Sequence, residues 1–186
     1  AAYQIAEEKA GVGTLRASAT TRLAEIDYRQ GELQDALERY RYILRTPSVV
    51  GTGSGILEHS RIESIRVLVE QGQFDEAELM LIDLRSSNRR DTYVRGALLY
   101  AQGISRSGDP ASARAMLGEI ESNFPESQFI PEVRLKIAEA HMDGGDWVEA
   151  REALDQWIAE FPDHALLAEV EFDKAWATAM AGNEDE

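Results

Sequence analysis

Residues 137–162 read IAEAHMDGGDWVEAREALDQWIAEFP, and the spacing of small and bulky residues around Gly145 predicts the fold. Alanine stands seven residues before this glycine and five after it, and bulky apolar residues stand nine and twelve after it. Steps of four and three residues place side chains on one face of a helix. The residues in question are Ala138, Ala150, Leu154 and Trp157. The stretch therefore predicts two helices that meet closely at their alanines and are joined by a glycine turn.

The same pattern recurs along the chain around five glycines that are separated by 41, 36, 37 and 37 residues. They are Gly31, Gly72, Gly108, Gly145 and Gly182. A steady period of this length indicates one helical unit that is repeated, each copy burying its apolar face against the next. We expect each glycine to take the left-handed position that ends the first helix of its unit. We expect prolines to follow the second helices, at Pro47, Pro125 and Pro162.

This register resembles the tetratricopeptide repeat (TPR). The stretches that carry the resemblance are LAEIDYRQGELQDALERYRYILRTP, IRVLVEQGQFDEAELMLIDL, YAQGISRSGDPASARAMLGEIESNFP and the stretch quoted above. The resemblance covers roughly residues 14–182. It implies an all-α fold, a TPR-type α-solenoid in which antiparallel helix pairs form a right-handed superhelix. The 36–37-residue step and the NFP and EFP junctions are similar to repeats of bacterial envelope-assembly proteins.

We predict one solenoid segment over residues 1–186, with helices near 1–10, 15–30, 33–45, 56–71, 74–86, 91–107, 110–123, 129–143, 147–160 and 165–181. Residues 1–13 are expected to end a preceding repeat or to form a cap helix. Four repeats are expected over 14–47, 56–90, 91–125 and 126–162, and the first helix of a truncated repeat over 163–186. Because both ends of the sequence fall inside this pattern, we expect the chain to be part of a longer solenoid.

Charge is distributed unevenly along the chain. Residues 1–95 hold 13 Lys and Arg against 15 Asp and Glu, whereas residues 96–186 hold 6 against 19, so the net charges are −2 and −13. An acidic surface argues against nucleic acid and anionic lipid as partners, because their phosphates require cationic contacts. It favours a partner with a basic segment, or serves solubility alone. No apolar run reaches the length of a membrane span, so no direct membrane insertion is expected.

Residues suited to catalysis or metal binding do not cluster in the sequence. The three histidines, His59, His141 and His164, lie far from one another and none is part of an HExxH motif. The chain has no cysteine, and GTGSG at residues 51–55 lacks the lysine of a phosphate-binding loop. We therefore expect no enzyme activity, no catalytic residues, no cofactor and no metal, and we expect the glycine-rich segment to be a loop.

The resemblance also implies where a partner would bind, because first helices of TPR units line the concave surface. Residues thirteen, ten, six, three and two before each glycine form one helical stripe there. The predicted partner-binding residues from this stripe are Tyr28, Arg29, Arg66, Arg95, Arg106, Glu132, Leu135, Glu139, Met142, Asp143, Phe172, Trp176 and Met180. An alternative stays open for the aromatic pair near the C-terminus: Phe172 and Trp176 either bind a partner or pack against a repeat that is missing.

The favoured hypothesis is a non-enzymatic scaffold that binds a peptide or partner protein in a concave groove within a larger bacterial assembly. One alternative is a structural spacer within a longer solenoid. Another is the regulatory domain of an enzyme whose catalytic part lies outside this chain. A periplasmic or envelope location is favoured over the cytoplasm, and the sequence leaves the oligomeric state open.

Overall fold

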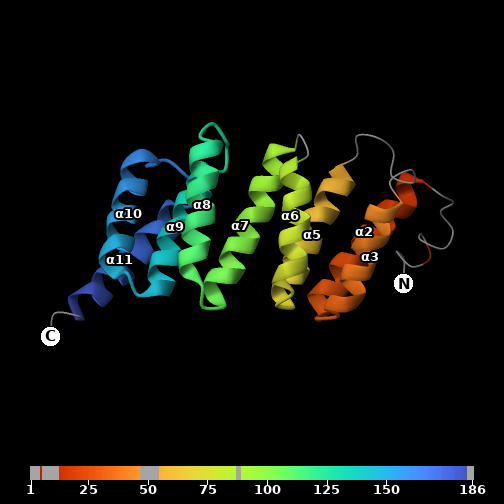
Figure 1. Cartoon of the computed structure of the whole chain (residues 1–186), viewed down its shortest axis with the longest axis horizontal. Coiled ribbons are helices and arrows are strands. Elements are labelled where there is room, and N and C mark those ends of the chain that lie inside the picture. The colour runs from red at the N-terminus through yellow and green to blue at the C-terminus, as the bar shows by residue number, and fades with distance from the viewer. Residues whose placement is uncertain (1–4, 6–12, 47–54, 87–88, 184–186) are drawn as a thin grey trace. The chain divides into compact units, whose positions relative to one another are not determined.

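The computed structural model describes residue 5 and residues 13–46, 55–86 and 89–183, and every regular element in these ranges is an α-helix (Figure 1). The described helices are α2 (Thr14–Gln30), α3 (Leu33–Arg45), α5 (Gly55–Glu70), α6 (Phe74–Ser86), α7 (Arg90–Arg106), α8 (Pro110–Asn123), α9 (Ile130–Gly144), α10 (Trp147–Glu160) and α11 (Leu167–Asn183). The predicted all-α fold class is therefore confirmed. The helix predicted near residues 1–10 and most of the junction at residues 46–55 lie outside the described residues.

The chain divides into two compact units, residues 1–88 and residues 89–186. In unit 1, α2 packs on α3, α3 packs on α5, and α5 packs on α6. In unit 2, each of the helices from α7 to α11 packs on the next one in the chain. We call α2, α5, α7, α9 and α11 the first helices, and α3, α6, α8 and α10 the second helices. The single segment predicted over 1–186 and its division into repeats stay predictions.

The residues that the repeat pattern predicts to be buried are buried in the structure. The residues five, nine and twelve after the first four glycines are all at most 3% exposed. They are Ala36, Ala77, Ala113, Ala150, Tyr40, Leu81, Leu117, Leu154, Ile43, Leu84, Ile120 and Trp157. Alanine recurs at the start of each second helix because its small side chain lets the paired helix approach closely, and the bulky residues then fill the widening space.

Four of the five glycines adopt the left-handed conformation that the repeat pattern predicts. Gly31, Gly72, Gly108 and Gly145 have φ values of 82°, 70°, 104° and 81°. At Gly145 the backbone N–H donates to the carbonyl of Met142, and the following N–H, of Asp146, donates to His141. This pair of bonds satisfies carbonyl groups that the end of α9 leaves free. Gly182 corrects the prediction: it lies within α11, because this helix continues to Asn183.

Candidate functional site

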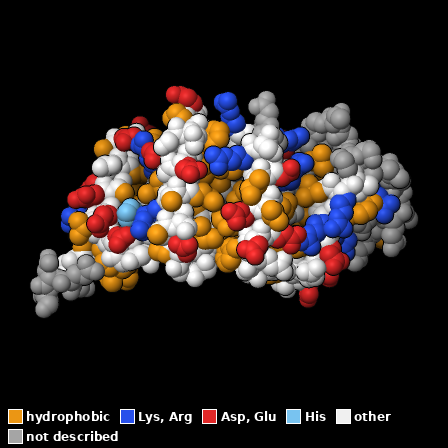
Figure 2. Space-filling view, in the orientation of Figure 1, with side chains coloured by type: hydrophobic (Ala, Val, Ile, Leu, Met, Phe, Trp, Pro, Cys, Tyr) orange, Lys and Arg blue, Asp and Glu red, His pale blue; other side chains and the backbone are white. Residues whose placement is uncertain are grey.

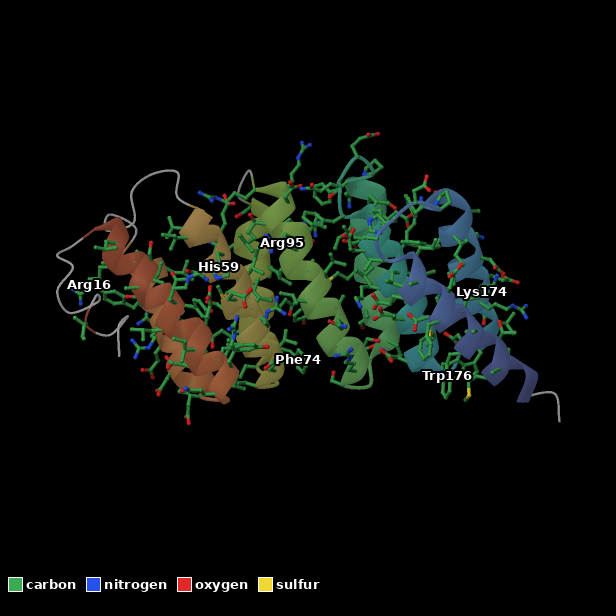
Figure 3. The ribbon with its side chains drawn as sticks, turned by 180° about the vertical axis from the view of Figure 1, so that it is seen from behind. Arg16, His59, Phe74, Arg95, Lys174 and Trp176 are labelled. Carbon is green, nitrogen blue, oxygen red and sulfur yellow. The ribbon has the colours of Figure 1, made fainter. Side chains whose placement is uncertain are left out.

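Within each unit, the predicted partner-binding residues belong to the first helices. In unit 2, α8 and α10 lie in front in Figure 1, whereas α11, with Trp176, is in front when the molecule is seen from behind in Figure 3. Figure 2 shows the side of the second helices, where acidic side chains are scattered over α8 and α10. The first helices of unit 2 therefore lie on the side opposite to the one shown in Figure 2.

In unit 1, the first-helix surface is held together by bonds between its own side chains. The hydroxyl of Tyr28 on α2 donates a hydrogen bond to Glu70 on α5. Burial, and then this carboxylate, raises the pKa of Tyr28 to about 12. Glu25 lies 3.2 Å from the imidazole of His59, and Arg66 donates to Glu63 at 2.9 Å. Of the residues predicted here, Tyr28 and Arg66 thus have partners within the unit.

A shallow hollow of about 280 Å³ opens between α2 and α5 near the start of α5. Its walls combine Glu25 and His59 with Arg22, which forms an ion pair of 2.7 Å with Glu25. Opposite charges therefore meet inside the hollow, and it presents no single sign of charge to a ligand. Arg29 lies outside this hollow and is exposed.

In unit 2, the first joint of the surface lies between α7 and α9. Ser105 is buried and its hydroxyl donates a 2.5 Å hydrogen bond to Asp143. Arg95 and Arg106 on α7 are exposed. Glu132 on α9 is half-buried, and its Oε2 atom is enclosed without a hydrogen-bond partner among the described residues. Asp143 thus links two first helices, and the two arginines stay accessible to solvent.

The second joint of this surface lies between α9 and α11 and is strongly acidic. Lys136 donates to both carboxylate oxygens of Glu139, at 2.5 and 2.7 Å. Burial raises the pKa of Glu139, and the negative charges of Asp173 and Glu169 on α11 raise it further, against the opposing effect of Lys136. Burial and Glu169 likewise raise the pKa of Asp173. Three carboxylates therefore interact around a single lysine, which leaves the joint with excess negative charge.

Trp176 belongs to the same face of α11, because it follows Asp173 by three residues and Glu169 by seven. Its side chain is 51% exposed. We call the surface made by Lys136, Glu139, Glu169, Asp173 and Trp176 the acidic joint. Lys136 and Asp173 were absent from the predicted site. They stand nine residues before their glycines, a position that the same helical spacing would have included.

Leu135 corrects the predicted site, because it does not line an accessible surface. It is 1% exposed and lies in a core shared with residues of α10 and α11. Met142 is half-buried and packs against the same core. The position ten residues before the glycine therefore faces the neighbouring helices. Phe172 occupies this position in α11, where it is 70% exposed, and Met180 nearby is half-buried.

The described residues contain no group of three or more His, Cys, Asp and Glu side chains arranged to hold a metal ion. None of the described helices has both the length and the apolar character that crossing a bilayer requires.

Comparison with known proteins supports the repeat assignment. Residues 106–170 match the family model of the tetratricopeptide repeat. The structure is similar to that of a Podospora anserina protein described as a kinesin light chain with nearly identical TPR-like repeats, with a TM-score of 0.66 and 19% identity. The match covers 91% of this chain and 88% of the other. At this identity the likeness concerns the fold alone. Among curated proteins, no significant match was found. The predicted resemblance to tetratricopeptide repeats is therefore confirmed, and the family model matches residues 106–170.

Proposed function

We propose that this tetratricopeptide-repeat chain binds a basic segment of a partner protein on the acidic joint of unit 2. Repeats of this family generally mediate protein–protein interaction and are typically not enzymes. The observation that carries the proposal is the meeting of Glu139, Glu169 and Asp173 around Lys136. Among the described carboxylates of the first helices, Glu139 and Asp173 have a pKa that burial and neighbouring negative charges raise.

The electrostatics of the acidic joint favour a cationic ligand. Carboxylates whose pKa is raised by their neighbours are held in an unfavourable charged state at neutral pH. An added lysine or arginine side chain would lower this repulsion. Its attraction would be screened less by salt than that of a fully exposed pair, since Glu139 and Asp173 are partly buried. Such a site would orient a basic segment and speed its encounter with the protein.

Trp176 supplies the apolar part of the proposed site. Tryptophan is enriched among residues that dominate binding energy at interfaces. Its ring also attracts a cation placed over its face, by roughly 0.5–1 kcal/mol at an exposed position. A partner segment with a basic side chain next to an apolar one would therefore complement the acidic joint. A short peptide segment can supply both side chains.

Peptide display tests this proposal directly. Random peptides would be selected on the immobilised chain, on the Glu139→Gln/Asp173→Asn variant, and on a control variant, Glu149→Gln/Glu152→Gln. The control removes the same charge from exposed positions of α10. We expect peptides rich in Lys and Arg from the chain and the control, and at least a tenfold loss of their affinity in the first variant, about 1.4 kcal/mol. Selected peptides without basic residues, or equal loss in both variants, would contradict the proposal.

A structural spacer is the second candidate, and the pairing within unit 1 favours it for that part of the chain. Tyr28 bonds Glu70, Glu25 lies against His59, and Arg66 pairs with Glu63. Side chains that satisfy one another gain less from a new partner, because those bonds would have to break first. If spacing is the whole function, reversing the charges of Glu132, Glu139 and Asp143 will leave every captured partner bound.

We also propose a cellular location for this function. A larger bacterial envelope assembly is favoured by the 36–37-residue step and by the NFP and EFP junctions. Fractionation of cells that produce the native full-length protein would test this: recovery in the cytoplasm would contradict an envelope location.

A further inference from the structure

A second polar cluster adjoins the acidic joint, between α7 and α9. Gln102 of α7 is half-buried, and its carboxamide is oriented by two donors. Its oxygen accepts from Arg106 at 3.1 Å and from Lys136 at 3.3 Å. One uncharged oxygen thus lies between two cations. We call Gln102, Arg106 and Lys136 the cationic cluster.

The positive charge of Arg106 is not balanced by a carboxylate. Arg106 is exposed, and it forms no ion pair with any residue that the structure describes. Asp143 on the neighbouring helix α9 accepts the 2.5 Å hydrogen bond of Ser105 instead. A carboxylate holds a guanidinium more strongly than an amide oxygen does, because two full charges attract and both carboxylate oxygens can be bound at once. The cationic cluster can therefore bind an anionic group more strongly than it binds Gln102.

Lys136 belongs to both the cationic cluster and the acidic joint. Its ammonium group contacts Gln102 of α7 and also donates to both carboxylate oxygens of Glu139. Glu139 in turn interacts electrostatically with Asp173 on α11. The charge of the first helices therefore changes from positive around Arg106 to negative around Asp173, and Lys136 lies where the sign changes.

From this charge arrangement we infer that the partner segment carries an acidic side chain beside its basic one, and that its carboxylate binds Arg106 and Lys136 while its cation binds the acidic joint. The inference rests on the proposed function and adds the acidic residue to it. A carboxylate at Lys136 would draw this lysine away from Glu139 and leave Glu139 free for the cation of the partner. The two charges of the segment should therefore bind cooperatively rather than independently.

The spacing of these two charges follows from the packing of the first helices. Helix α9 contacts both α7 and α11. The axes of packed helices lie roughly 8–10 Å apart. A segment in the polyproline II conformation rises about 3.1 Å per residue and has three residues per turn, so side chains three positions apart lie on one side, about 9 Å from each other. We therefore expect the acidic and basic residues of the segment to stand three positions apart.

Synthetic peptides with blocked ends test the inference, because only their side chains then carry charge. Each peptide carries an arginine next to a leucine and, three positions from the arginine, either aspartate or asparagine. Both orders along the peptide are made, since a segment can lie in the site in either direction. Calorimetric titration of the chain gives each affinity. We expect the aspartate peptide, in one of the two orders, to bind at least fivefold more tightly than its asparagine counterpart. The gain should be smaller in peptides that carry glutamine in place of the arginine.

Three single substitutions, each lowering the net charge by one, identify where the aspartate binds. Arg106→Gln removes the cation, and Gln102→Glu fills the cationic cluster with a carboxylate of its own. Both should reduce the gain from aspartate to less than twofold. Arg90→Gln is the matched control and should keep the full gain. Arg90 is exposed at the other end of α7, about 24 Å away along the helix.

The inference is overturned if aspartate adds no affinity, or if the gain survives in Arg106→Gln. It is also overturned if Arg90→Gln loses the gain to the same extent, since net charge alone would then explain it. These failures differ from a failure of the proposed function. If replacing the arginine of the peptide by glutamine weakens binding, the proposed function holds whether or not aspartate matters. If that replacement has no effect, or if no peptide binds, the proposed function fails and the inference fails with it.

Discussion

The Ser105 hydroxyl on α7 donates a 2.5 Å hydrogen bond to Asp143 on α9, and the hydroxyl of Tyr28 on α2 bonds Glu70 on α5 in the same register. In both cases the donor stands three residues before one glycine of the repeat and the carboxylate two residues before the next. The two units therefore use one position pair to join successive first helices. Tyr28 and Asp143, predicted to bind a partner, have this structural role.

Removal of the hydrogen bond between Ser105 and Asp143 should lower the free energy of unfolding modestly. Ser105→Ala deletes the donor, and Asp143 is exposed enough to bind water instead. We expect a loss of about 1 kcal/mol and a fall in melting temperature of roughly 2–4 °C. Ser122→Ala is the control, because its hydroxyl donates to the carbonyl of Gly118 within its own helix, α8, and joins no other described helix. Equal effects of the two substitutions would show that the link between the helices adds nothing.

The tyrosine of unit 1 should make the protein sensitive to alkali. The pKa of Tyr28 rises from 10.0 to about 12 in the folded state. The folded state therefore holds this proton more tightly than the unfolded state does. The resulting stability is fully present below pH 10 and is lost as pH rises through about 12.

Urea denaturation at a series of pH values checks this dependence on Tyr28. The free energy of unfolding should fall above pH 10 more steeply in the native chain than in Tyr28→Phe. Parallel curves for the two proteins would contradict the assignment. Absorbance of the phenolate gives a second measure. The number of tyrosines that ionise only at high pH should be lower by one in Tyr28→Phe than in the native chain.

The acidic joint should respond to pH in the acid range. The pKa of Glu139 is raised above its ordinary 4.5. For a raised pKa, the stabilising contribution is present below 4.5 and is lost as pH rises through the higher folded value. At neutral pH, then, the charged Glu139 opposes folding.

Glu139→Gln should remove this dependence. As pH falls from neutral toward 4.5, the native chain should gain unfolding free energy relative to the variant. Chemical denaturation at each pH measures the difference. Glu149→Gln, an exposed substitution on α10, serves as the control for the change in net charge. The prediction is wrong if the difference between native chain and Glu139→Gln does not change with pH.

Two glycines of the same register should respond oppositely to alanine. Gly145 has φ of 81°, and an added Cβ would meet nothing within 4 Å, so the cost of alanine there is backbone strain alone. We expect Gly145→Ala to destabilise the protein by roughly 1–2 kcal/mol. Gly182 lies inside α11, where alanine is the better helix former by up to about 1 kcal/mol. Thermal denaturation of both variants decides the matter: destabilisation by Gly182→Ala would mean that this glycine also forms a turn.

The repeat register was predictable because it depends on local spacing. A glycine, an alanine five residues later and bulky residues nine and twelve later determine which face of each second helix is buried. Most helix bounds followed from the same pattern, within two residues. The pattern did not show that α11 continues through Gly182, because a glycine permits a left-handed turn without requiring one.

The candidate site was predictable only in part. Helical spacing identified the side of the first helices that carries Glu139 and Trp176, but it grouped Leu135 and Phe172 with them. Leu135 is buried in a core shared with α10 and α11, whereas Phe172 is exposed, and a periodicity in one helix does not reveal where the next helix lies.

The sequence by itself therefore determined the helical repeat, four of its five predicted glycine turns and its core positions, because these depend on residues close together in the chain. Only the tertiary structure decided which polar residues of the stripe bond one another and which remain available. Ser105 meets Asp143 across 38 positions, and Glu139 meets Asp173 from the next first helix. Contacts of this kind depend on how two helices pack side by side, and that geometry is a property of the folded unit rather than of either segment alone.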